Sequence, residues 1–111
     1  MKIGKLSIKR EDADTTFKKA KGLMFRKNLD RALVFWLDRE SRLGASIHSY
    51  FVFFPFDIIW LDKNKQIVDT RTIPPFRLIQ MPKKKAKYFI ELPAGSIKKA
   101  NVSIGQRINL D

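Results

Sequence analysis

The stretch SIHSYFVFFPFDIIWLD, residues 46–62, is the most apolar part of a chain whose formal net charge is +12. Side chains of residues 46–54 alternate between two faces of an extended segment, and both faces are mainly apolar. That pattern is typical of a central strand covered on both sides, so we expect a strand that includes His48. Pro55 cannot donate a hydrogen bond to a neighbouring strand, so this strand should end there and a second strand should begin at Phe56.

Short strand-like segments surround this stretch. Residues 63–65 indicate a turn, and residues 66–73 have the pattern of a hairpin partner for the strand at Phe56. The segments that favour further strands are 2–8, 31–37, 87–93 and 105–110, and those that favour short helices are 14–22 and 94–102. The chain is therefore predicted to be mainly β, a small antiparallel β-barrel or sandwich of about seven strands with one or two short helices.

The composition suits a single domain over residues 1–111. Hydrophobic residues make up 44% of the chain and charged residues 31%, which is typical of a globular protein. Cysteine is absent, which excludes disulfides and thiolate metal sites, and a single histidine argues against an ordinary zinc site. We therefore expect no metal and no cofactor.

No apolar run in the sequence has the length of a signal peptide or of a membrane span. The absence of cysteine also agrees with a reducing compartment. We expect a soluble, cytoplasmic protein with no membrane partner, present as a monomer or a weak dimer.

The positive charge is concentrated toward the two ends of the chain. Residues 1–31 carry ten Lys/Arg and four acids, residues 32–62 carry two and four, and residues 63–111 carry eleven and three. One interpretation is a surface for nucleic acid, which would bind weakly and without sequence preference. Its candidate residues are Lys83, Lys84, Lys85, Lys87, Lys98 and Lys99. The other interpretation is a lysine-rich solvated surface of a thermostable protein.

Thirteen aromatic residues are many for a chain of this size. Most of them fall in apolar runs, which places them in the core. Phe76, in PPFRL, and Tyr88, beside the lysine loop, are the exceptions, and exposed rings on a basic surface can stack on single-stranded bases.

A candidate polar pocket is centred on His48, the one side chain that titrates near neutral pH. Asp57 or Glu91 could orient its ring, although Asp57 could instead tie a turn by accepting backbone N–H bonds. Glu91 lies among apolar neighbours and needs a partner, for which Arg26 is suited. Arg26 would then form a structural ion pair or hold an anionic ligand. Lys19 and Thr72 complete the candidate set.

Three functions are compatible with these residues. The first is a binding module for a small anionic or polar ligand in a cleft that contains Arg26, His48 and Glu91. The second is nucleic-acid binding through the lysine-rich surface. The third is a hydrolase-type enzyme that uses His48 with a carboxylate, although no nucleophile elbow, phosphate loop or metal site is evident. Lysines that gather on one face would favour nucleic acid, and dispersed lysines would favour the first function.

The segment ADTTFKKAKGLMFRKNL resembles the opening signature of the DUF 192 family, an uncharacterised protein family of archaea and bacteria. The matching residues are Ala13, Thr15, Lys19, Gly22, Leu23, Met24 and Arg26. Further segments follow in the family's order: ALVF, PFDIIWLD, QIV, YFIELPAG and IGQRI. The resemblance implies a compact β-barrel-like domain with no established activity.

The chain also departs from the common pattern of that family. Ile47 and His48 stand where many members have Phe-Trp, and Gln106 stands where many have aspartate. These differences resemble an archaeal-type branch of the family.

Overall fold

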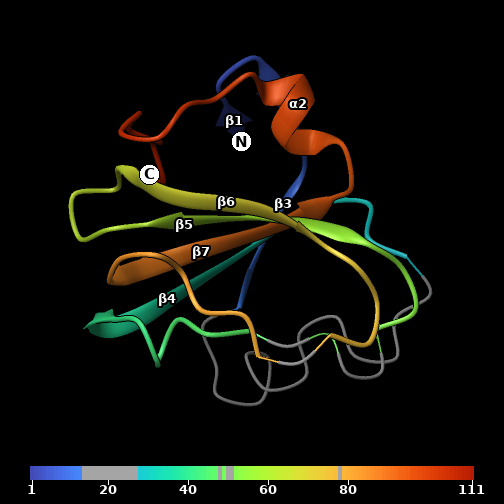
Figure 1. Cartoon of the computed structure of the whole chain (residues 1–111). Coiled ribbons are helices and arrows are strands. Elements are labelled where there is room, and N and C mark those ends of the chain that lie inside the picture. Colours follow the sequence, from blue (N-terminus) through green and yellow to red (C-terminus); the bar gives the residue numbers. More distant parts are fainter. Residues whose placement is uncertain (14–27, 48, 50–51, 78) are drawn as a thin grey trace.

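The computed structural model describes residues 1–13, 28–47, 49, 52–77 and 79–111. These residues contain seven strands and one helix (Figure 1), which confirms the predicted mainly β class. The elements are β1 (Lys2–Ile3), β2 (Leu6–Ser7), β3 (Arg10–Ala13), β4 (Ala32–Ser41), β5 (Phe56–Leu61), β6 (Ile67–Ile73), β7 (Ala86–Pro93) and α2 (Ser96–Ala100). The predicted helix over residues 14–22 lies outside the described residues.

Five strands form one open sheet in the order β3-β4-β7-β5-β6, and β1 and β2 form a separate hairpin. Neighbouring strands are antiparallel except for β3 and β4, which are parallel. Because β3 and β6 remain edges of the sheet, the described residues form a sandwich-like fold and not a closed barrel.

Strands β5 and β7 occupy the middle of the sheet, and every residue of β5 is buried. The predicted strand at Phe56 and its hairpin partner are therefore confirmed as β5 and β6. The central strand predicted over residues 46–54 is wrong for the described part of that segment, where only Ile47 makes a bridge, to Gln80. Its apolar side chains cover the sheet from outside instead.

Two further strand predictions needed correction. Residues 105–110 form no strand, and their one strand-like contact is a bridge between Gln66 and Arg107. Residues 2–8 form two short strands because Gly4 turns the chain at a φ of +55°. A Cβ at Gly4 would lie 2.3 Å from the carbonyl oxygen of Ala100, so only glycine fits between the hairpin and α2.

A layer of chain covers each face of the sheet. On one face, here called the loop face, Ala45, Ile47 and Val52 pack against a cluster that includes Phe35 and Ile58. The opposite face, here called the helix face, is covered by the β1–β2 hairpin, α2 and the C-terminal segment. On the helix face, Ile3, Ala100 and Ile108 pack against a cluster that includes Ile59 and Leu92. Figure 1 shows the sheet between these two layers.

Candidate functional site

Asp57 lies on the helix face and anchors α2. Its Oδ1 accepts a hydrogen bond of 2.7 Å from the hydroxyl of Thr72, which is its cross-strand partner on β6. Its Oδ2 accepts a bond of 2.9 Å from the backbone N–H of Ile97. The carboxylate is buried, and both of its oxygens are engaged in holding two elements together. This arrangement supports the interpretation of Asp57 as a carboxylate that accepts a backbone N–H.

Glu91 lies on the opposite face of the sheet from Asp57. In β7 it pairs with Ile58 of β5 and Leu33 of β4, both of which belong to the loop-face cluster. Asp57 pairs with Leu92, the residue next to Glu91, and neighbouring residues of a strand point to opposite faces. The structure therefore separates Asp57 and Thr72 from Glu91. Three other members of the predicted pocket, Lys19, Arg26 and His48, lie outside the described residues.

Glu91 is 7% exposed, and two loops contribute described residues to the layer on its face of the sheet. We call the described residues of 42–55 and 74–85 the paired loops. They are joined by backbone hydrogen bonds in both directions between Ile47 and Gln80. The paired loops are therefore the part of the structure next to which the predicted pocket would lie.

Ser49 is the residue that holds the paired loops together, and it is fully buried. Its hydroxyl donates to the carbonyl oxygen of Pro74 at 2.8 Å and accepts from the backbone N–H of Arg77 at 2.6 Å. Its own N–H donates to the carbonyl oxygen of Arg77, and its carbonyl oxygen accepts from the N–H groups of Val52 and Phe76. One serine thus satisfies backbone groups on both loops.

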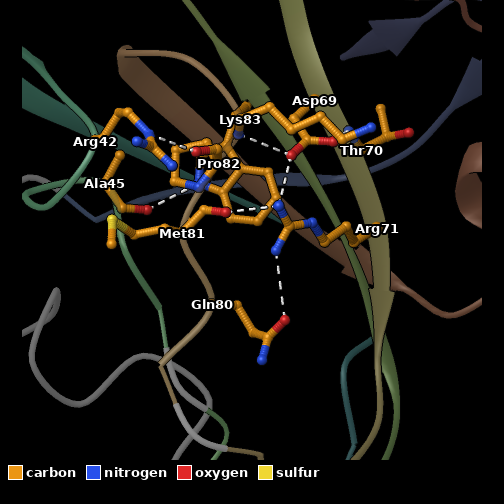
Figure 2. A network of polar contacts seen from close by, with 10 residues as sticks. Arg42, Ala45, Asp69, Thr70, Arg71, Gln80, Met81, Pro82 and Lys83 are labelled. Carbon is orange, nitrogen blue, oxygen red and sulfur yellow. Dashed lines mark hydrogen bonds and ion pairs between the residues drawn. The ribbon is translucent and has the colours of Figure 1, made fainter.

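A second set of contacts ties the paired loops to the sheet, as Figure 2 shows. The guanidinium of Arg71 donates to the carbonyl oxygen of Met81 at 2.6 Å and pairs with Asp69 at 2.8 Å. It lies 5.1 Å from the ring centroid of Trp60, a geometry in which the cation is attracted to the ring. The indole N–H of Trp60 in turn donates to the carbonyl oxygen of Ala45 at 2.8 Å.

Large apolar side chains project from the paired loops into solvent. Of the six exposed large hydrophobic residues among those that the structure describes, five belong to these loops: Leu43, Phe53, Phe76, Ile79 and Met81. Phe53 and Phe76 are 60% and 57% exposed, and their rings meet edge to face with centroids 5.2 Å apart. Phe76 also has a φ of +58°, a region that bulky residues rarely adopt.

The paired loops carry positive charge without any acid. Residues 42–55 and 74–85 contain five Lys/Arg and no Asp or Glu. Sequence reasoning singled out Phe76 and the lysines of this region but missed Ser49, Phe53 and Arg71. The absence of acids was readable from the sequence, whereas the contacts of Ser49 were not.

The six lysines predicted for nucleic acid do not form one patch. Lys83, Lys84 and Lys85 precede β7, whereas Lys98 and Lys99 lie in α2 beyond its other end. The eight residues of β7 span roughly 23 Å. Tyr88 is partly buried against the helix-face cluster, so of the two aromatic exceptions only Phe76 is exposed.

Asp30 and Arg31 have shifted pKa values and are not part of the paired loops. The Arg31 guanidinium donates a hydrogen bond to Asp30 and holds the pKa of that carboxyl below its ordinary value. Among the described residues, no group of three or more acidic or histidine side chains is arranged to hold a metal ion. None of the helices in that part of the chain is long and apolar enough to cross a membrane.

Comparison with known proteins gives relatives in sequence and in structure. A UPF0127 protein of Thermococcus sibiricus is 45% identical over 97 residues, which cover 87% of this chain and 62% of that protein. A UPF0127 protein of Pyrococcus abyssi is 44% identical over 98 residues, which cover 88% of this chain and 82% of that protein. The chain thus spans about three fifths of the Thermococcus relative, and no function is stated for either protein.

The fold recurs in a crystal structure of a protein of unknown function from Novosphingobium aromaticivorans. The two structures superpose with a TM-score of 0.79 at 20% sequence identity, over 90% of this chain and 73% of the other. The family model for DUF192, described as Uncharacterized ACR, matches residues 1–110, which confirms the resemblance inferred from the sequence motifs. The archaeal relatives agree with an archaeal branch of that family. The chain therefore belongs to the DUF192 family.

Proposed function

We propose that this domain is a binding module for a small anionic ligand and that the ligand binds at the paired loops. The observation that carries the proposal is the combination of firmly held loops, exposed apolar side chains and five cations without an acid. An anion near these loops is attracted by the five cations of the loops, and an apolar portion of the ligand meets rings and aliphatic chains.

The rigidity of the paired loops supports this proposal. Ser49 and Trp60 fix the loops through partly or fully buried hydrogen bonds, and Arg71 adds an exposed one, so less conformational entropy remains to be lost on binding. Phe76 keeps a left-handed backbone conformation that costs about 1 kcal/mol or more, and such strain is typical of ligand-binding sites. An exposed ring held at that cost is better explained by contact with a ligand than by packing.

An interior pocket beneath the paired loops remains part of the proposal. Glu91 is buried on the face that these loops cover, and the loop that contains Ala45 and Ile47 continues directly into His48. Arg26 and His48 would supply the positive charge for a ligand there. Asp57 and Thr72 are not members of that pocket, because they bond each other on the opposite face.

Nucleic acid is the less favoured ligand. Its candidate lysines are divided between the two ends of β7, so they do not form one continuous surface for a polyanion. A protein with a net charge of +12 binds any polyanion at low salt by counterion release, and we expect that binding to be weak at physiological salt.

A titration of the isotope-labelled protein with inorganic phosphate, followed by NMR at constant ionic strength, tests the proposal. Chloride at the same ionic strength is the control anion. We expect saturable shifts of the amides of Arg77, Lys83 and Lys84, which the variant Lys83→Gln/Lys84→Gln reduces. The matched variant Lys98→Gln/Lys99→Gln on the helix face leaves those shifts unchanged. Shifts that are absent, or that centre on Lys98 and Lys99, would contradict the proposal.

A further inference from the structure

The exposed apolar side chains of the paired loops are not buried by packing against other described residues. Ile79 is 60% exposed and Met81 is also exposed, and they flank Gln80, which bridges to Ile47. Because alternate residues of an extended segment share a side, Ile79 and Met81 lie on the same face of the segment, opposite to the side chain of Gln80. Phe53 and Phe76 extend the same loops with a pair of exposed rings. The loops therefore present apolar tips rather than a polar surface.

We infer that the paired loops dock on a membrane surface that carries anionic phosphate headgroups. This inference rests on the proposed function and names its ligand as the phosphate of a lipid in a bilayer. Phe53, Phe76, Ile79 and Met81 enter the boundary between headgroups and acyl chains, and Arg77 with Lys83, Lys84 and Lys85 contacts the headgroups. Such a surface gains free energy from both the buried apolar area and the attraction of cations to anionic lipid.

The high exposure of the apolar tips favours a lipid surface over a peptide. A side chain that lines a groove loses much of its exposure to the opposite wall, whereas Phe53, Phe76 and Ile79 each keep more than half of theirs. An extended peptide could instead add to a sheet edge, but the start of edge strand β6 is already occupied. Ile67 exchanges backbone hydrogen bonds with Gly105 and Gln106 there.

The same side chains fit a bilayer better than a single strand of nucleic acid. Bases stack on the faces of rings, and Ile79 and Met81 offer no such face. The rings of Phe53 and Phe76 are T-shaped, with an interplanar angle of 80°, so they do not form a continuous stacking platform. All four residues supply apolar area, which is what the acyl boundary requires.

Charge complementarity selects an anionic occupant and disfavours a second copy of this chain. The loops carry five cations and no acid, so two copies joined through this surface would bring like charges together. Three consecutive lysines, Lys83 to Lys85, attract the many anionic headgroups of a bilayer without requiring a single binding geometry. Each lysine should raise the affinity about fivefold. The sequence led us to expect no membrane partner, and this inference departs from that expectation while requiring no membrane-spanning segment.

Co-sedimentation with lipid vesicles tests the inference. Vesicles of phosphatidylcholine and phosphatidylglycerol in a 70:30 ratio are compared with pure phosphatidylcholine at 150 mM NaCl. We expect the protein to bind the anionic vesicles and not the neutral ones. Ile79→Ser should lower the partition coefficient about tenfold, whereas Ile104→Ser, at a residue that is 63% exposed on the C-terminal segment, should leave it unchanged.

A matched pair of lysine variants tests the electrostatic part. Lys83→Gln/Lys84→Gln should weaken vesicle binding about 25-fold, which is fivefold for each lysine, and Lys98→Gln/Lys99→Gln should not. The backbone N–H of Lys83 bonds Asp69, and it is retained in the variant, so the fold is preserved. Equal melting temperatures across the four variants exclude unfolding as the cause.

The remaining outcomes separate the two proposals. Phosphate shifts at the loops without vesicle binding would overturn the lipid inference and leave the proposed function standing. Loss of both signals would overturn both. Vesicle binding that falls equally in the Ile79 and Ile104 variants would overturn the docking surface. Binding of a single-stranded oligonucleotide at 150 mM NaCl that depends on Ile79, without vesicle binding, would replace the lipid with nucleic acid.

Discussion

The two layers that cover the sheet differ in how many large apolar side chains they leave exposed. On the helix face, the hairpin, α2 and the C-terminal segment turn apolar side chains such as Ile3, Ala100 and Ile108 inward, where they are almost fully buried. On the loop face, the paired loops bury Ile47 and Val52 but are also fixed by polar bonds from Ser49, Arg71 and Trp60. Five large apolar side chains of those loops remain exposed: Leu43, Phe53, Phe76, Ile79 and Met81.

This difference separates a layer that serves stability from one that serves recognition. A covering layer that needs only to stabilise the sheet gains most by turning its apolar side chains inward, as the helix face does. A layer that must contact a partner has to leave apolar area outside and therefore needs another means of holding its shape. Hydrogen bonds from the buried Ser49 hydroxyl and from the partly exposed Arg71 guanidinium provide that means here.

Removing the anchor of the helix face should have the largest effect on stability. Asp57→Ala deletes both bonds of a buried carboxylate, to Thr72 and to the N–H of Ile97, and should lower the free energy of unfolding by about 3 kcal/mol. Urea unfolding measures this loss, with Thr72→Val as the smaller change of about 1 kcal/mol. Vesicle binding by the protein that remains folded should be unaffected. A loss of vesicle binding as large as the loss of stability would contradict the assignment of separate roles to the two layers.

Removing the Ser49 hydroxyl should disturb the loop face by a smaller amount. Ser49→Ala leaves the carbonyl oxygen of Pro74 and the N–H of Arg77 without their bonds, at a cost of about 2 kcal/mol. Because Phe53 and Phe76 depend on these loops, anion binding should weaken as well. Ser46→Ala is the matched control, since Ser46 is partly exposed and its hydroxyl donates only to the carbonyl oxygen of Arg42. Equal losses of stability and of anion binding in the two serine variants would contradict a special role of Ser49 in holding the paired loops.

Replacing the arginine at the edge of the paired loops should have a moderate effect. Arg71→Lys keeps the charge but loses the planar group that reaches Asp69, Met81 and the ring of Trp60 together, at a cost of about 1 kcal/mol. Amide hydrogen exchange should increase at residues 80–83 and stay constant in α2. Unchanged exchange at residues 80–83 would show that this network does not fix the loop.

The smallest effect isolates the strain at Phe76. Phe76→Gly should be more stable than Phe76→Ala by about 1 kcal/mol, because glycine accepts a φ of +58° without a clash of Cβ. Phe53 does not have a positive φ, so Phe53→Ala should be the more stable of its own pair. The same order at both positions, measured by urea unfolding, would show that Phe76 carries no such strain.

The segments with their own local pattern were predictable from the sequence. The restart of the apolar run after Pro55 and the turn at residues 63–65 identified β5 and β6, and the strand-like segment 87–93 identified β7. Residues 46–54 were wrongly predicted as a strand. Apolar residues on both sides of an extended segment are typical of a buried strand, but a loop that covers a sheet can have the same pattern. The hydrogen bonds of Ser49 reach residues 25 and 28 positions away, and no local pattern encodes such contacts.

The candidate site was predictable only in part. Burial of Glu91 followed from its apolar neighbours, but its separation from Asp57 depends on the register of β5 against β7, which pairs Asp57 with Leu92. A one-residue difference along a strand reverses the face to which a side chain points. Arg26, His48 and Lys19 lie outside the described residues, so their shared pocket remains a prediction.

Hydrogen exchange of the wild-type protein with and without anionic vesicles tests most directly whether the loop face is the recognition layer. Exchange is followed by mass spectrometry in peptides from the paired loops and from residues 94–110. The account predicts slower exchange in residues 42–47 and 74–83 when 70:30 phosphatidylcholine–phosphatidylglycerol vesicles are present, and no change in residues 94–110. Protection confined to residues 94–110, or spread equally over both layers, would contradict it.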